Sequence, residues 1–153
     1  MGKTSLVRQF VEGRFDDRYL STIGVKISRR TVARAEYQLK MLIWDLAGGE
    51  DYNDVTSGYL RGAAAVLLVC DLTRPLTLLT LKKYVDQLAD INLQPALVVA
   101  GNKVDLIEER ALTADQLAEF AAEIGASYLL TSAKSGAGVA EAFDLLAEAI
   151  ETK

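Results

Sequence analysis

Apolar runs of strand length alternate along this chain with segments of helical periodicity, and this alternation narrows the possible folds more than any other feature. The runs 63–72 and 96–101 are almost continuously apolar, which is typical of central parallel strands covered on both faces. Four other segments carry apolar residues at helical spacing: 4–12, 76–91, 114–124 and 139–150. The pattern predicts an α/β fold in which helices cover both faces of a mostly parallel central sheet.

Two further strand-like segments, 25–35 and 37–46, follow each other so closely that they predict a hairpin, with one antiparallel strand at the sheet edge. Arg29, Arg30 and Arg34 lie in the first segment. We interpret them as a solvated strand face rather than a nucleic-acid patch. A last short strand is expected at 127–130, and residues 16–24 are loop-like.

The length of 153 residues fits a single domain over 1–153, and the net charge of −4 gives no general attraction to nucleic acid. The chain has one cysteine, Cys70, and no histidine, so an internal disulfide and histidine chemistry are excluded. Neither a signal peptide nor a membrane span is apparent, and the last residues contain no cysteine for prenylation. We therefore expect a cytoplasmic protein without an intrinsic membrane anchor.

The tripeptide Gly2-Lys3-Thr4 runs directly into the first predicted helix. Glycine lets the backbone approach a phosphate, lysine neutralises it, the hydroxyl can bind Mg²⁺, and the helix N-terminus adds its dipole. Alone, this tripeptide is a weak signal, because most such sequences are loops that bind nothing.

Asp45 ends an apolar strand and is followed by Gly48 and Gly49. A carboxylate at the carboxyl end of a strand faces the crevice where α/β sheets bind ligands, and there it can hold Mg²⁺ through water. The alternative is an aspartate that caps the next segment. The two glycines favour a loop that approaches a terminal phosphate.

Two tetrapeptides follow later strands: residues 102–105, Asn-Lys-Val-Asp, and residues 131–134, Thr-Ser-Ala-Lys. Asp105 can accept hydrogen bonds from N1–H and the 2-amino group of guanine, a donor pair that adenine lacks. Asn102 can tie loops together, the stem of Lys103 can lie along the base, and the Ala133 N–H can reach guanine O6. An ordinary strand-to-helix turn is a serious alternative for either tetrapeptide alone.

All four motifs occur in order, each in the expected strand or helix context, and chance agreement is remote. The chain thereby resembles the Ras-like small GTPases, with the Rab-like members, including prokaryotic ones, the nearest. The resemblance implies a P-loop NTPase G domain that binds GTP or GDP with Mg²⁺ and hydrolyses GTP. It also implies effector, exchange and activating proteins as partners.

The resemblance assigns the site residue by residue. Lys3, Gly48 and Gly49 take the catalytic positions, and Thr4, Thr22 and Asp45 the metal positions, with Thr22 a ligand only in the triphosphate state. The two nucleotide-sensitive switches are expected near 15–24 and 47–62. The nucleotide-binding positions are Gly2, Lys3, Thr4, Ser5, Phe15, Thr22, Gly48, Asn102, Lys103, Asp105, Ser132, Ala133 and Lys134.

The chain departs from the family pattern in two places. The family begins with a central strand and the first half of the phosphate loop, so we expect a truncated chain or a misplaced start here. Gly49 stands where most of the family has the glutamine that orients the attacking water. Slow intrinsic hydrolysis that depends on a partner is therefore expected.

Three functions compete at this stage. The first is a GTP-hydrolysing switch. The second is a degenerate G domain that does not hydrolyse nucleotide and acts as a scaffold or interaction module. An ATP-using P-loop enzyme is third, because residues 102–105 favour guanine.

Overall fold

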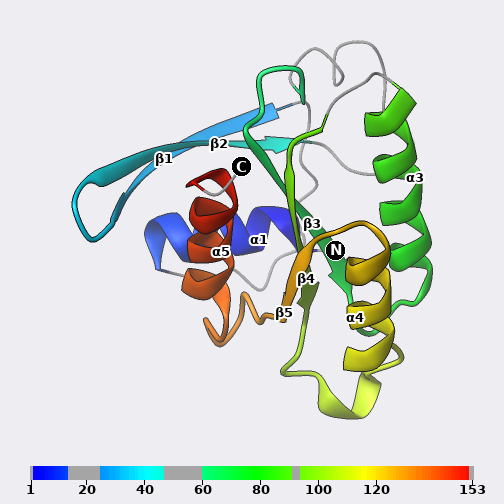
Figure 1. Ribbon diagram of the computed structural model, residues 1–153. Helices are drawn as coiled ribbons and strands as arrows, with labels where there is room; N and C mark the ends of the chain where they lie inside the picture. Colours follow the sequence, from blue (N-terminus) through cyan, green and yellow to red (C-terminus); the bar gives the residue numbers. More distant parts are fainter. Residues whose placement is uncertain (1, 14–24, 47–59, 91–93, 152–153) are drawn as a thin grey trace.

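The computed structural model describes residues 2–13, 25–46, 60–90 and 94–151 (Figure 1). The helices and strands predicted within these residues are present, and their ends differ from the prediction by at most two residues. In chain order they are α1 (Lys3–Glu12), β1 (Val25–Ala33), β2 (Gln38–Leu46), β3 (Ala65–Asp71), α3 (Leu76–Asp90), β4 (Ala96–Asn102), the 3₁₀ turn η1 (Ile107–Glu109), α4 (Ala114–Glu123), β5 (Ser127–Leu130) and α5 (Val139–Glu151).

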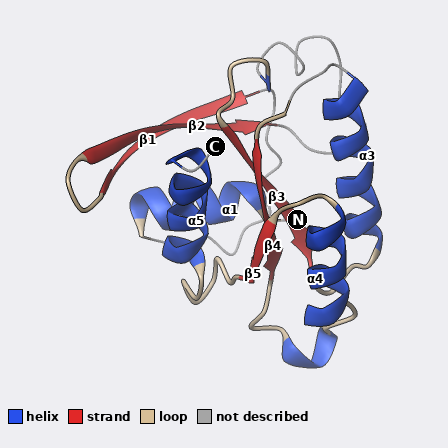
Figure 2. Cartoon of the chain, in the orientation of Figure 1, coloured by secondary structure: helices blue, strands red, loops and turns tan. Residues whose placement is uncertain are grey.

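Strands β3, β4 and β5 form a parallel sheet in that order (Figure 2). Its residues alternate between two cores because successive strand side chains point to opposite faces. Val69, Val98 and Ala100 face one core, whereas Cys70 and Val99 face the other. The continuous apolar runs in the sequence are thereby explained.

Helices cover both faces of this sheet, as predicted. Leu6 of α1 and Phe143 of α5 pack in the first core, and Leu81 of α3 and Leu117 of α4 pack in the second. Figure 1 shows α1 and α5 on one side of the strands and α3 and α4 on the other. Helix α4 begins at a capping box. The Thr113 side chain accepts a hydrogen bond from the Gln116 N–H, and the Gln116 side chain accepts one from the Thr113 N–H.

The β1–β2 hairpin is antiparallel, with Val25 opposite Leu46 and Ala33 opposite Gln38. It was expected to supply an edge of the central sheet, but among the described residues it forms a separate two-stranded sheet. The hairpin nevertheless shares a core with the parallel sheet, because Met41 and Ile43 pack against the cluster that contains Leu6.

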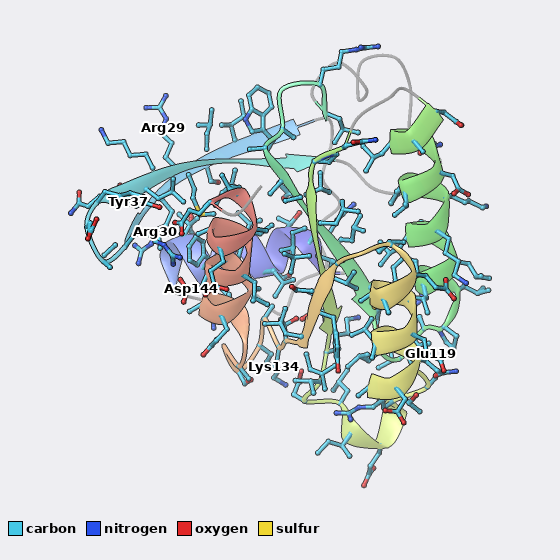
Figure 3. All side chains as sticks on the ribbon, in the orientation of Figure 1. Arg29, Arg30, Tyr37, Glu119, Lys134 and Asp144 are labelled. Atoms are coloured by element: carbon cyan, nitrogen blue, oxygen red, sulfur yellow. The ribbon has the colours of Figure 1, made fainter. Side chains whose placement is uncertain are left out.

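Arg29 and Arg30 are exposed, as expected for a solvated strand face, but Arg30 and Arg34 also contact helices. The Arg30 guanidinium lies 5.6 Å from the centre of the Phe10 ring, and that ring stacks on Phe143 at 3.9 Å. Arg34 donates two hydrogen bonds to Glu151, of 2.8 and 3.1 Å. Figure 3 shows Arg30 and Tyr37 on the hairpin that extends past α5, and Asp144 on that helix.

Cys70 is fully buried, as predicted for a small core side chain. Burial raises the pKa of its thiol to about 12, with the Asp71 carboxylate adding to the shift. The thiol is therefore protonated at neutral pH and unreactive. None of the described helices combines the length and hydropathy needed to cross a bilayer.

Candidate nucleotide-binding site

Two groups of predicted site residues, 102–105 and 132–134, lie at or after the carboxyl ends of the parallel strands β4 and β5. Asp71 at the end of β3 lies opposite Asn102 at the end of β4, so both strands finish at one edge. Phe15, Thr22, Gly48 and Gly49 lie outside the described residues, as do nearly all residues of the two expected switches. The described site residues are Gly2, Lys3, Thr4, Ser5, Asp45, Asn102, Lys103, Asp105, Ser132, Ala133 and Lys134.

Asn102 connects the strand ends with the loop that follows β5. Its side-chain oxygen accepts hydrogen bonds from the Thr131 hydroxyl at 3.2 Å and from the Ala133 N–H at 3.3 Å. All three groups are buried, with Asn102 only 1% exposed. A buried amide oxygen that satisfies two donors from another loop fixes both loops, as the sequence predicted.

The same amide reaches the start of α1. Gly2 adopts a left-handed backbone with φ of 85°, and a Cβ built there would lie 2.3 Å from the Asn102 side-chain nitrogen. Only glycine therefore allows the α1 N-terminus to approach Asn102 so closely. This contact brings the expected phosphate end of the site against the expected base end.

Asp105 faces the loop after β5. The Ser132 hydroxyl donates to the Asp105 Oδ1 at 2.7 Å, while the Asp105 residue itself remains exposed. The bond holds the carboxylate in one orientation and leaves its second oxygen for a ligand. An anchored acceptor at the mouth of the site can bind adjacent donors such as N1–H and a 2-amino group.

Lys3 and Asp45 form the charged part of the site. Burial lowers the pKa of the Lys3 ammonium, and the Asp45 carboxylate partly opposes this shift. Asp45 is only 4% exposed, and neither of its oxygens has a hydrogen-bond partner among the described residues. A buried carboxylate without donors is costly, so this position is suited to a cation or to metal-bound water.

The residues present fit Mg²⁺ better than a cage-bound transition metal. Within the described ranges, no three acidic, cysteine or histidine side chains gather closely enough to hold a metal ion. Mg²⁺ that is bound with phosphates usually keeps several waters and needs only one or two protein carboxylates or hydroxyls. The buried Asp45 oxygens and the Thr4 hydroxyl supply donors of this kind.

Two residues expected to contact the base have partners within the protein. The Ala133 N–H, assigned to guanine O6, donates to the Asn102 side-chain oxygen. Lys103 pairs with the Asp71 carboxylate, whose Oδ2 lies 2.8 Å from the lysine nitrogen. Lys134 is exposed on the loop between β5 and α5, where Figure 3 labels it.

The sequence reasoning missed three residues that build the site. Asp71 pairs with Lys103, Thr131 donates to Asn102, and Gly138 lets the loop pass the end of β5. Asp71 carried a usable signal, because it ends an apolar strand as Asp45 does. Thr131 lies in the tetrapeptide 131–134 but was assigned no role, and Gly138 carried no signal, since both roles arise from contacts between separate segments.

Comparison with known proteins agrees with this geometry. Residues 1–152 match the Ras family. The Ras-related protein RABD2c of Arabidopsis thaliana is 36% identical over 156 residues, a match covering 100% of this chain and 76% of that protein. The Ras-related protein Rab5A of Oryza sativa subsp. japonica is 38% identical over 148 residues, with coverage of 96% and 73%. The human Ras-related protein Rab-8B is 34% identical over 154 residues, with coverage of 100% and 74%. Since the match to the family spans nearly the whole chain, this chain belongs to the Ras family of small GTPases.

Proposed function

We propose that this small GTPase binds GTP and GDP together with Mg²⁺ and hydrolyses GTP slowly, with help from a partner protein. The partners are effector, exchange and activating proteins that distinguish its two nucleotide states. The proposal joins three parts of the site: the base end, the phosphate end and the residue expected to orient water.

Asp105 and Asn102 support the base end of the proposal. The Ser132 hydroxyl anchors one Asp105 oxygen at 2.7 Å, so the carboxylate is oriented before any ligand arrives. Preorganised acceptors bind more tightly because less conformational freedom is lost on binding. Asn102 holds the loop after β5 in place around this acceptor.

The environment of the Asp45 carboxylate is the observation on which the proposal depends most. Both of its oxygens are buried without hydrogen-bond partners among the described residues, and the nearby Lys3 ammonium has its pKa lowered by burial. A phosphate satisfies the lysine, and a hydrated divalent cation satisfies the carboxylate. One Mg²⁺–nucleotide complex would therefore supply partners to both side chains.

In this proposal Lys3 binds the terminal phosphates, Thr4 donates its hydroxyl oxygen to the metal, and Asp45 holds a metal-bound water. Bound Mg²⁺ neutralises phosphate charge and orients the phosphates for in-line attack. The N-terminus of α1, which has no side-chain cap, adds backbone N–H groups that can bind an anion.

Gly49 supports slow hydrolysis, because glycine has no side chain with which to orient water. We expect Gly49→Gln to raise the single-turnover rate of phosphate release by about tenfold or more, in line with the contribution of a positioned polar group. An unchanged rate, with GTP binding intact, would show that the slow step lies elsewhere.

The test of the proposal measures GDP affinity with saturating Mg²⁺ and with a chelator. We expect chelation to weaken GDP binding to the native chain by about tenfold or more, and Asp45→Asn to remove most of this dependence. Asp86→Asn, a change at an exposed position on α3, is the matched control and keeps the native dependence.

Equal Mg²⁺ dependence in the native chain and Asp45→Asn would refute the metal assignment. Absence of GDP binding under all conditions would support the scaffold function instead. Bound nucleotide in the purified protein, identified by mass spectrometry, separates the switch from the scaffold independently.

A further inference from the structure

Asp71 is a buried charge that the proposed binding scheme does not use. Its side chain is 0% exposed at the end of β3. The Thr73 N–H and hydroxyl donate to its Oδ1 at 2.9 and 2.6 Å, and its Oδ2 lies 2.8 Å from the Lys103 nitrogen. Burying an ionised carboxylate is costly unless its oxygens are held by donors or a cation. These contacts therefore hold the Asp71 carboxylate in one orientation.

The Asp71 charge is retained in the folded protein. Burial acts to raise the pKa of its carboxyl group, but the close Lys103 ammonium and the hydrogen bonds from Thr73 outweigh that effect and the pKa is lowered. Asp71 is thus an anion at neutral pH, and it offers the Lys103 ammonium a permanent counter-charge.

The backbone of Lys103, from which its side chain leaves, has an unusual conformation. Its φ of 69° lies in the left-handed region, and among the described residues no other non-glycine residue has a positive φ. The backbone on either side is fixed, since Leu72 N–H donates to the Asn102 carbonyl and Val104 N–H donates to the Thr131 carbonyl, both at 3.0 Å. Strained residues of this kind persist where surrounding contacts determine the conformation, and they concentrate at functional sites.

Both ends of the Lys103 side chain are therefore set before a ligand arrives. The backbone fixes the direction in which the stem leaves, and Asp71 fixes the position of the ammonium. Lysine side chains lose considerable rotamer freedom when they are ordered, so an ordered stem binds a planar base at lower entropic cost.

We infer that Asp71 is a positioning residue for guanine-nucleotide binding, which acts by holding the Lys103 ammonium so that the lysine stem is preset along the base. This inference rests on the guanine pocket proposed above, and it adds a residue from β3 to that pocket. Asp71 itself touches no nucleotide atom in this scheme.

The test is a double-mutant cycle on GDP affinity at saturating Mg²⁺, with the native chain, Asp71→Asn, Lys103→Met and the double variant. We expect Asp71→Asn to weaken GDP binding about tenfold, because an amide cannot hold the ammonium as a carboxylate does. In the Lys103→Met background, the same change is expected to weaken binding by less than about twofold, because the group through which Asp71 acts is gone. Asp86→Asn again controls for the loss of one acidic charge and leaves the affinity unchanged.

A second comparison avoids changing the buried carboxylate, in case Asp71→Asn does not fold. Lys103→Arg keeps a cation that can pair with Asp71, whereas Lys103→Met has a stem of similar length without charge. We expect the arginine variant to retain GDP affinity at least about fivefold better than the methionine variant. Equal affinities of these two variants would overturn the inference.

The outcomes distinguish this inference from the function on which it rests. Failure of the native chain to bind GDP refutes the guanine pocket itself. Binding by the native chain, with equal or tighter binding by Asp71→Asn, refutes only the positioning role. An equal loss from Asp71→Asn in both backgrounds also refutes it, because Asp71 then acts through the fold and not through Lys103.

Discussion

Replacing Asn102 with alanine is the substitution whose effect on folding the structure specifies most fully. The side chain is 1% exposed, and its oxygen accepts from two buried donors, the Thr131 hydroxyl and the Ala133 N–H. Asn102→Ala removes this acceptor. Both donors are then left buried without their partner.

The magnitude follows from the two donors separately. An orphaned buried donor costs about 1–3 kcal/mol. The Ala133 N–H belongs to the backbone and cannot turn toward another acceptor, whereas the Thr131 hydroxyl can rotate, so its cost falls at the lower end. We expect Asn102→Ala to lower the free energy of unfolding by about 2–4 kcal/mol, a large part of the about 5–15 kcal/mol of a typical domain.

Urea unfolding followed by far-ultraviolet circular dichroism measures this change, in a chelating buffer without nucleotide so that ligand binding does not contribute. With a slope of about 2 kcal/mol per molar urea, the midpoint falls by about 1–2 M. Thr131→Val supplies the second arm, because it replaces the orphaned hydroxyl with a methyl group of similar size.

The double variant Asn102→Ala/Thr131→Val is expected to be about 1 kcal/mol more stable than the sum of the single changes predicts, because one orphaned donor has been removed. A loss below about 1 kcal/mol for Asn102→Ala would refute the reasoning. So would strictly additive effects of the two substitutions.

Two other substitutions test separate parts of the fold. Gly138→Ala is expected to cost about 3 kcal/mol in thermal unfolding, because its φ is 70° and the new Cβ would lie 2.3 Å from the Leu130 carbonyl oxygen. Gly125→Ala, with φ of 69° and no atom within 4 Å, is the matched control and should cost only about 1 kcal/mol; equal losses would contradict the steric argument. Hydrogen bonds from Arg34 and Tyr37 lower the pKa of the Glu151 carboxyl, so its contribution is present above its unfolded pKa and disappears as pH falls through the lowered folded value. The difference in thermal midpoint between the native chain and Glu151→Gln should therefore close on acidification, and a difference independent of pH would show that the ion pair is not its source.

Much of the fold could be predicted because its apolar pattern is local. The continuous runs that became β3 and β4 are buried on both faces, and the stripe of α5 places Phe143 and Leu146 in the core. The predicted ends of helices and strands were less accurate where side-chain or loop contacts determine where an element stops. Strand β1, for example, ends at Ala33 because the hairpin turn begins there. The Arg34 N–H closes that turn by donating to the Tyr37 carbonyl at 2.8 Å.

A role in the site could be predicted where it depends on the chemistry of a single residue. It was harder to predict where it depends on a contact between two residues distant in the sequence. Asn102 was expected to tie loops together, and its side-chain oxygen accepts two hydrogen bonds from the loop after β5. Asp105 accepts from the Ser132 hydroxyl, and its expected contact with guanine stays a prediction. The pairing of Lys103 with Asp71 depends on neighbouring strands ending in register, which no local pattern encodes. The contact of Arg34 with Glu151 spans 117 positions and was not predicted for the same reason.

Guanine selectivity decides whether the account of this site stands, and calorimetric titration of the native chain with GDP, IDP and ADP at saturating Mg²⁺ measures it. IDP lacks only the 2-amino group, so we expect it to bind about 10- to 100-fold more weakly than GDP, with ADP weaker still. In Asp105→Ala the gap between GDP and IDP should nearly vanish, because the acceptor of that amino group is gone. Equal affinities of the native chain for GDP and ADP, or a GDP–IDP gap that survives in Asp105→Ala, would contradict the assignment of Asp105 to the base.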